Sequence, residues 1–245
     1  MQAIQRKTAT PKDISNAKTT HRRGACGSMS VKSVPKKGYK SVPWLFGKEI
    51  EIPEEWEVKK ISDCDVKVTT GSRNTQDKIE NGKYPFYVRS QKIEKINTFS
   101  FDTEAILTAG DGVGTGKVFH YINGKFDLHQ RAYSISNFGK KLNGKFFYHY
   151  FQKNFFVRAM TMNANASVDS IRMDTITEMK ILCPPLPEQQ QIASILSNVD
   201  NLIQNTGKLI ENTTRLKKGL MQELLTRGIG HTKFKKVPWF VWKRN

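Results

Sequence analysis

The sequence has little cysteine and no long apolar run, and these two shortages narrow the class of protein. Its three cysteines, Cys26, Cys64 and Cys183, lie far apart and form no CxxC pair. This pattern argues against a zinc ribbon or a disulfide framework and is typical of a reducing compartment. The longest apolar runs are a handful of residues, whereas a transmembrane helix needs about 20. We therefore expect a cytoplasmic localisation and no association with a membrane.

Acidic residues are scarce relative to basic ones. Asp and Glu number 22 against 40 Lys and Arg, which gives a formal net charge of +18 over 245 residues. Such an excess predicts a polyanionic partner, most simply a nucleic acid. Residues 1–48 carry a net +10 and residues 227–245 a net +6. We expect a disordered basic arm over residues 1–40 and a basic tail over residues 229–245.

Familiar catalytic patterns are also missing. The loop Gly110–Lys117 resembles a phosphate-binding loop, but Asp111 stands where the first glycine is needed and Val118 where Ser or Thr is needed. Two alternatives remain for this loop: a backbone that closely approaches a phosphate or a base edge, and a tight turn. Glu57-Val-Lys59 and Glu178-Met-Lys180 each match half of a nuclease motif, but such short strings are common by chance. We expect no catalytic residue and no metal site.

Residues 188–226 carry the clearest periodicity. Their apolar positions follow steps of three and four, which is the seam of a coiled coil. Pro184, Pro185 and Pro187 argue against helix before this segment, and Gly228 and Gly230 can end it. We expect a long partner-seeking helix whose seam consists of Ile192, Ile195, Val199, Leu202, Thr206, Leu209, Thr213, Leu216, Leu220 and Leu224.

Residues 41–187 indicate a mixed α/β domain, so the fold class is α+β with one long coiled-coil-forming helix after the domain. Short strand-like runs are separated by Gly, Asn and Asp turns. Asn123–Gly124 lies between two such runs and predicts a hairpin turn. Residues 146–159 predict a helix that packs Phe147, Tyr150, Phe151, Phe155 and Val157 on one side.

Polar and basic side chains beside the Gly and Asn turns are the candidate DNA-binding residues. His129-Gln130-Arg131 follows the second strand-like run. Gln pairs with adenine and Arg with guanine in the major groove, although a buried histidine satisfied by its neighbours is the alternative interpretation. The candidates are Ser72, Arg73, Asn74, Arg89, Ser90, Gln91, Lys117, Gln130, Arg131, Asn163 and Asn165.

Three stretches carry a resemblance to a known family. Ile52-Pro-Glu-Glu-Trp-Glu-Val58 precedes the mixed domain, Pro184-Pro-Leu-Pro-Glu-Gln189 precedes the long helix, and Lys218-Gly-Leu-Met-Gln-Glu-Leu-Leu-Thr226 ends it. They resemble the start of a target recognition domain and the two ends of a spacer helix in the specificity (S) subunits of type I restriction–modification systems. The resemblance implies a target recognition domain over residues 41–187 and a spacer or dimerisation helix over residues 188–228.

The resemblance also implies a function. Such a subunit has no catalysis of its own: it reads double-stranded DNA and docks methyltransferase (modification) subunits through its long helix, and a restriction subunit joins them. S-adenosylmethionine is then expected on the methyltransferase partner, with no cofactor bound by this chain. A stand-alone metal-dependent nuclease or DNA methyltransferase is the alternative, and an oligomerisation adaptor with polyanion-binding ends is a weaker one.

An internal repeat indicates a half-size form of the family. Residues 39–48 align with residues 234–243, with five identities in ten positions and a constant offset of 195. The sequence thus holds one recognition domain, one spacer and the start of a second unit, and a natural half-size gene, an interrupted gene and a truncated chain all fit this pattern. We expect a homodimer through the long helix that reads a gapped palindrome. We also expect residues 1–28 to be dispensable, with Met29 as a second plausible start.

Overall fold

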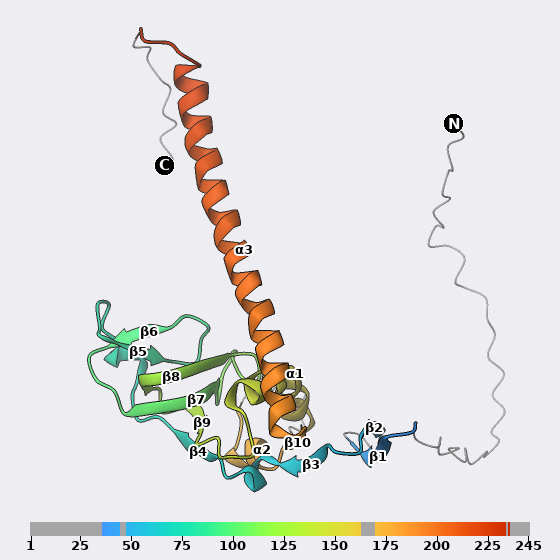
Figure 1. Cartoon of the computed structure of the whole chain (residues 1–245). Helices are drawn as coiled ribbons and strands as arrows, with labels where there is room; N and C mark the ends of the chain where they lie inside the picture. The colour runs from blue at the N-terminus through green and yellow to red at the C-terminus, as the bar shows by residue number, and fades with distance from the viewer. Residues whose placement is uncertain (1–35, 45–47, 163–169, 234, 236–245) are drawn as a thin grey trace, which may run out of the picture.

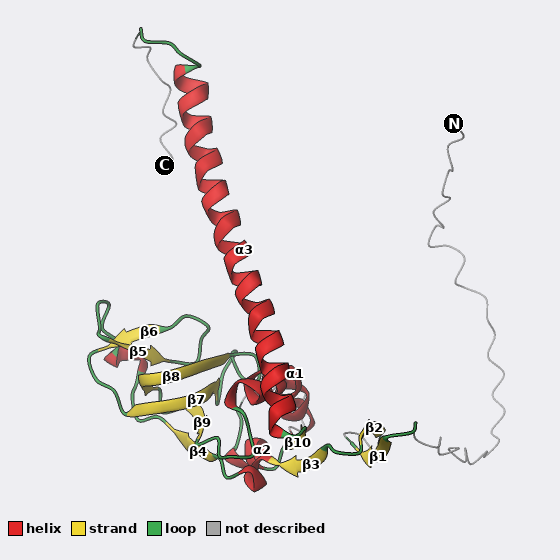
Figure 2. Ribbon diagram, viewed as in Figure 1, coloured by secondary structure: helices red, strands yellow, loops and turns green. Residues whose placement is uncertain are grey.

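The computed structural model describes residues 36–44, 48–162, 170–233 and 235. A mixed domain of strands and helices is followed by one long helix, α3 (Leu186–Arg227), as Figures 1 and 2 show. The predicted fold, an α+β domain with a long helix after it, is confirmed. In the described ranges no helix combines the length and the apolar character needed to cross a membrane.

The largest sheet in the described part of the chain has six strands in the order β4-β9-β7-β8-β5-β6. Neighbouring strands are antiparallel except β5 and β8, which are parallel. The strands are β4 (Lys67–Thr70), β5 (Tyr84–Tyr87), β6 (Glu94–Ile96), β7 (Phe101–Ala109), β8 (Phe119–Leu128) and β9 (Ala132–Ser136).

This sheet is strongly curled. Strands β8 and β9 both pair antiparallel with β7, on its opposite sides, so they run in the same direction. Residues 129–131 alone connect them, whereas a flat sheet needs a crossover of a dozen or more residues between parallel strands. The curl brings the end of β8 back to the end of β7, where the Gly110 N–H bonds the Arg131 carbonyl at 2.9 Å. It therefore gathers the loops at that end.

The predicted hairpin turn at Asn123–Gly124 is wrong. Both residues lie within β8, where they pair with Glu104 and Thr103 of β7. Gly124 has φ +133°, a conformation that a side chain would disfavour. The local turn signal instead marks a glycine inside one continuous strand, because pairing with β7 continues through it.

Two smaller sheets lie beside the six-stranded sheet. One joins β1 (Tyr39–Pro43) to β2 (Glu49–Pro53), and the other joins β3 (Glu57–Lys60) to β10 (Lys180–Cys183). Strand β10 contributes Ile181 and Cys183 to the main core. The arm expected over residues 1–40 lies outside the described residues up to residue 35, and its last two positions belong to β1. The expected arm is therefore wrong at these two positions, because Tyr39 pairs with Pro53 and Lys40 donates from Nζ to the Glu54 carbonyl at 2.8 Å.

The core lies between the six-stranded sheet and α1 (Gly144–Met162), with the short α2 (Met173–Thr177) beside it. Phe147, Phe151 and Phe155 are fully buried, and the last two rings stack with centroids 4.2 Å apart. The expected helix is confirmed with longer bounds. Val157 is an exception at 41% exposed, because it falls outside the four-residue spacing of the buried phenylalanines.

Helix α3 begins at Leu186, two residues earlier than expected, and Arg227 is its last residue before Gly228 (φ +69°). Pro187 lies in its first turn, where a missing N–H costs no intrahelical bond. The buried Gln189 fixes this end: its Oε1 accepts from the Asn143 N–H at 2.9 Å. Its Nε2 donates to the carbonyls of Lys141 and Pro184, at 3.0 and 2.8 Å.

Candidate functional site

Four loop segments meet where β7 ends: residues 71–74, 89–91, 110–117 and 129–131. We call them together the polar loop surface. The Gln130 N–H bonds the Arg73 carbonyl at 2.9 Å, and Gln91 Nε2 donates to the Lys117 carbonyl at 3.2 Å. Most of the expected DNA-binding residues are therefore neighbours in space, although they span 60 positions of the sequence.

A carboxylate joins two arginines at the centre of this surface. Asp111 Oδ1 accepts from Arg89 Nη1 and Oδ2 accepts from Arg131 Nη1, each at 2.7 Å. The arginine side chains are 41% and 64% exposed, whereas that of Asp111 is 15% exposed. Burial alone would raise the pKa of the Asp111 carboxyl, but the hydrogen bonds from Arg131 and Arg89 outweigh burial and hold this pKa below its usual value. The group is thus an ionised carboxylate between two partly exposed cations.

The glycines of the 110–117 loop allow close approach to these arginines. A Cβ at Gly110 would meet the Arg131 carbonyl oxygen at 2.8 Å, and one at Gly114 would meet the Arg89 carbonyl oxygen at 2.4 Å. Backbone bonds from Thr115 to Gly112 and from Lys117 to Gly114 close successive turns. The loop is a series of tight turns, and its backbone lies close to the two segments that bear Arg131 and Arg89.

Arg73 is held to the protein. Its Nε lies 3.3 Å from Oδ2 of the fully buried Asp127, and its Nη2 donates to Thr98 Oγ1 at 3.1 Å. Thr98 in turn donates to the same carboxylate at 2.8 Å. This guanidinium neutralises a buried charge and fixes the 71–74 segment, so it is less available for a base than Arg131.

His129 fits the alternative interpretation, because it is buried and its Nδ1 accepts from the Arg131 N–H at 3.0 Å. Burial lowers its pKa. Gln130 and Arg131 are exposed beside it, and Gln130 Nε2 donates to Asn74 Oδ1 at 2.6 Å. The turn therefore points one residue inward and presents two to solvent.

The other expected DNA-binding residues are placed as follows. Ser72 is exposed, the Ser90 hydroxyl donates to the Lys92 carbonyl at 3.1 Å, and Lys117 Nζ lies 5.7 Å from the centre of the Phe156 ring. Asn163 and Asn165 lie outside the described residues. A surface hollow of about 260 Å³ lies beside the arginine cluster. Its lining comprises Thr70, Gly110, Asp111, Gln130, Arg131, Tyr133, Ser170 and Ile171.

Sequence reasoning missed Asp111, which it considered only as the residue that breaks a phosphate-loop pattern. A signal was present, because Asp111 is the one acidic residue in a loop otherwise made of glycine, small residues and a lysine. The glutamates of the two nuclease-like strings are ion-paired: Glu57 with Lys59, and Glu178 with Lys60 at 2.5 Å. Over the described ranges, no group of three or more His, Cys, Asp or Glu is arranged to hold a metal.

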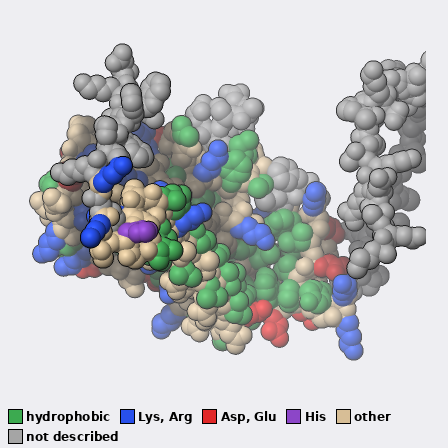
Figure 3. All heavy atoms as spheres, turned by 90° about the horizontal axis from the view of Figure 1, so that it is seen from above, with side chains coloured by type: hydrophobic (Ala, Val, Ile, Leu, Met, Phe, Trp, Pro, Cys, Tyr) green, Lys and Arg blue, Asp and Glu red, His purple; other side chains and the backbone are tan. Residues whose placement is uncertain are grey.

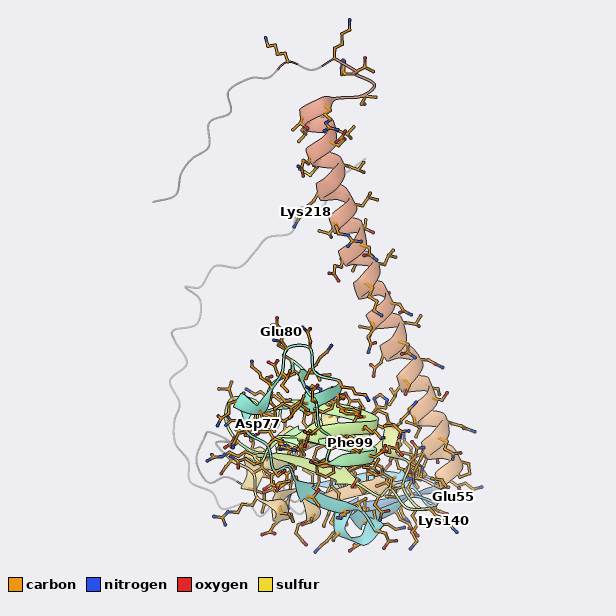
Figure 4. All side chains as sticks on the ribbon, turned by 90° about the vertical axis from the view of Figure 1, so that its left-hand side faces the viewer. Glu55, Asp77, Glu80, Phe99, Lys140 and Lys218 are labelled. Atoms are coloured by element: carbon orange, nitrogen blue, oxygen red, sulfur yellow. The ribbon has the colours of Figure 1, made fainter. Side chains whose placement is uncertain are left out.

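The long helix carries a second distinctive surface. Ile192 packs against the domain core, and Ala193 is buried. The later seam leucines, isoleucine and valine are 46% to 66% exposed, and Figure 3, which looks at the molecule from above, shows hydrophobic side chains among those uncovered on this side. Figure 4 places Lys218 on the helix far from Glu55 and Lys140 near its base. We call this surface the apolar helix face: Ile195, Val199, Leu202, Leu209, Leu216, Leu220 and Leu224.

Comparison with known proteins identifies the family. Residues 53–215 match a family model described as the type I restriction modification DNA specificity domain. The chain belongs to this family. The match extends from the end of β2, through the polar loop surface, into the apolar helix face. The resemblance found in the sequence motifs is thereby confirmed.

Similar curated proteins include the type I restriction enzyme EcoDI specificity subunit of Escherichia coli, 28% identical over 72% of this chain. The MjaVIII specificity subunit of Methanocaldococcus jannaschii is 32% identical over 76% of this chain. The chain covers 38% of the first relative and 46% of the second. It therefore spans less than half of the length of these two members of its family.

Solved structures share the fold. An S subunit of a type I restriction-modification system from M. genitalium aligns with a TM-score of 0.58 at 20% identity, covering 69% of this chain and 45% of that one. A chain from a study of complex assembly and conformational transition in a type I R-M system aligns with a TM-score of 0.52 at 14% identity, covering 72% and 46%. The sheet-and-helix domain with its long helix is therefore an arrangement that occurs in this family.

Proposed function

We propose that this chain is the DNA-reading component of a type I restriction–modification system and performs no catalytic step itself. The observation that carries the proposal is the polar loop surface, which lies within the family-matched residues and presents Gln130 and Arg131 to solvent. The names of the similar proteins, which are specificity subunits, support the same function over the nuclease or methyltransferase alternative.

The chemistry of recognition follows from the donors on this surface. An arginine can bond both O6 and N7 of guanine, and a glutamine can bond N6 and N7 of adenine, so the two residues distinguish base pairs in the major groove. The net charge of +18 adds attraction to phosphates that does not depend on sequence. Arg131 is the residue we expect to contribute most, because Arg73 is committed to Asp127.

The test is selection of a target from a randomised duplex library by the full chain, followed by binding of the selected duplex. We expect Arg131→Ala to weaken target binding by about 1–3 kcal/mol and to relax one base position. Arg215→Ala is the matched control, because it removes the same charge from an exposed position on α3. Failure of the wild type to select any sequence would refute the proposed function.

We propose that the apolar helix face docks a second copy of this chain, and that the paired helices then bind methyltransferase subunits, with a restriction subunit joining the complex. A helix with such a stripe is unstable alone in water. Within the described residues no second helix approaches its length, so the described part of the chain offers no intramolecular partner for this face. Two identical domains on an antiparallel pair would read a gapped palindrome.

Light scattering tests the dimer. The wild type should have twice the chain mass, and the double variant Leu209→Glu with Leu216→Glu should be monomeric because each glutamate would be buried unpaired. Gln204→Glu with Gln222→Glu is the control, because it adds the same charges at exposed positions on the opposite side of the helix. A monomeric wild type that binds one undivided site, or a bipartite target that is not palindromic, would contradict the dimer.

Co-purification tests the partners, and a chemical assay tests the absence of catalysis. Methyltransferase subunits should be retained by the wild type and by the control pair but not by the double variant. The pure chain with DNA, Mg²⁺ and S-adenosylmethionine should neither cleave nor methylate the duplex, since S-adenosylmethionine is expected on the partner. Modification by the pure chain would instead favour the enzyme alternative.

A further inference from the structure

Asp111 is the carboxylate that holds both partly exposed arginines of the polar loop surface. Each of its oxygens accepts one hydrogen bond, from Arg89 on one side and from Arg131 on the other. A guanidinium has five N–H donors, and each arginine uses one of them on this carboxylate. The remaining donors are available for an incoming partner.

The backbone around Asp111 is itself fixed. The Ile171 N–H bonds the Gly110 carbonyl at 2.7 Å, and Asp111 forms a bridge with Ser170. On the other side, the Gly110 N–H bonds the Arg131 carbonyl. The position of the carboxylate is therefore fixed by backbone contacts, and one of these contacts is made by Arg131, which is also one of its two hydrogen-bond donors.

A fixed carboxylate matters because an arginine recognises guanine only when its guanidinium plane has a defined orientation. A bidentate bond to O6 and N7 forms only when both donors lie in the plane of the base. A free arginine on the surface samples many rotamers and pays their entropy on binding. It also bonds phosphates, which carry no sequence information. A carboxylate behind the guanidinium restricts the rotamers and offsets part of the charge that attracts phosphate.

We propose that Asp111 is a positioning residue for specificity: it orients Arg131 and Arg89 toward a guanine-containing base pair and reduces their binding to unrelated DNA. The inference deepens the proposed DNA-reading function and rests on it. It predicts that loss of the carboxylate weakens binding to the target without weakening binding to unrelated DNA. Loss of an ordinary structural residue would weaken both.

The experiment measures binding of the full chain to its selected duplex and to an unrelated duplex of equal length, with a salt series. In Asp111→Asn we expect at least a 10-fold loss of affinity for the target and unchanged or higher affinity for the unrelated duplex. The unrelated duplex should also show a steeper salt dependence, because a freed arginine can neutralise a phosphate. Asp111→Glu, which keeps the carboxylate, should recover part of the discrimination.

The matched control is Asp102→Asn on β7, which changes the charge equally at an exposed position. It should leave the ratio of the two affinities unchanged. An Asp111→Asn variant with the wild-type ratio would overturn this inference alone. Equal losses for both duplexes together with a lowered melting temperature would show a structural role and overturn it as well. A wild type with no sequence preference would refute the proposed function and this inference together.

Discussion

Replacing Gln189 by alanine should loosen the junction between the domain and α3. The side chain is buried, and three hydrogen bonds connect it to Asn143, Lys141 and Pro184. Each such bond contributes about 1 kcal/mol net, so their loss should lower the free energy of unfolding by about 3 kcal/mol. Alanine adds back a few tenths of a kcal/mol through its helix propensity. For a chain of this size the melting temperature should fall by roughly 6–12 °C.

The assay is thermal unfolding followed by circular dichroism, with Gln190→Ala as the control. Gln190 is the exposed neighbour of the same type, and its substitution should stay within about 0.5 kcal/mol of the wild type. Gln189→Glu should be more harmful than alanine, because it places a carboxylate oxygen against the carbonyls of Lys141 and Pro184. Equal melting temperatures for the Gln189→Ala and Gln190→Ala variants would refute the reasoning.

Two further predictions concern pH and the glycine-rich loop. Burial lowers the pKa of His129 and His149 in the folded chain, so the unfolded chain binds protons first as pH falls below about 6.5, and stability should drop from pH 7.5 to pH 5. Urea unfolding midpoints that do not change over this interval would contradict it. Gly114→Ala places a Cβ 2.4 Å from the Arg89 carbonyl oxygen, so it should lower stability by about 1–3 kcal/mol and weaken target binding. A variant as stable as the wild type would show that the loop moves aside.

The sequence predicted the elements that local pattern controls. The apolar spacing of α3 identified the helix, and its start was misplaced by two residues because Pro187 was taken as a stop signal although it fits a first turn. The prediction of a turn at Asn123–Gly124 was wrong for the opposite reason. Its chemistry is local, whereas the continuation of β8 depends on pairing with β7, a segment about 20 residues away. Such pairing leaves no mark in a short window of sequence.

The candidate site was predicted as a set of polar loop residues but not as an arrangement. Composition near turns was enough to select Arg89, Gln130 and Arg131, and the curl of the sheet brings them together. The same reasoning treated Arg73 as equivalent to them, because nothing in the sequence reveals that Asp127 is buried and needs a counter-charge. The role of Asp111 was likewise hidden, since its two partners lie 22 and 20 residues away on either side.

The attachment of α3 to the domain also determines how precisely the far end of the helix is placed. The 42 residues of the helix span about 63 Å, so a tilt of about 5° at the base displaces the far end by about 5 Å. That displacement exceeds the rise between two residues of a strand. The angle of the helix is set at its base, where Gln189 and Ala193 are buried and Ile192 packs against the domain core, so the position of Leu224 depends on how firmly these residues are held. A small change of the helix angle at Gln189 would therefore produce a displacement of several ångströms at the opposite end of the helix.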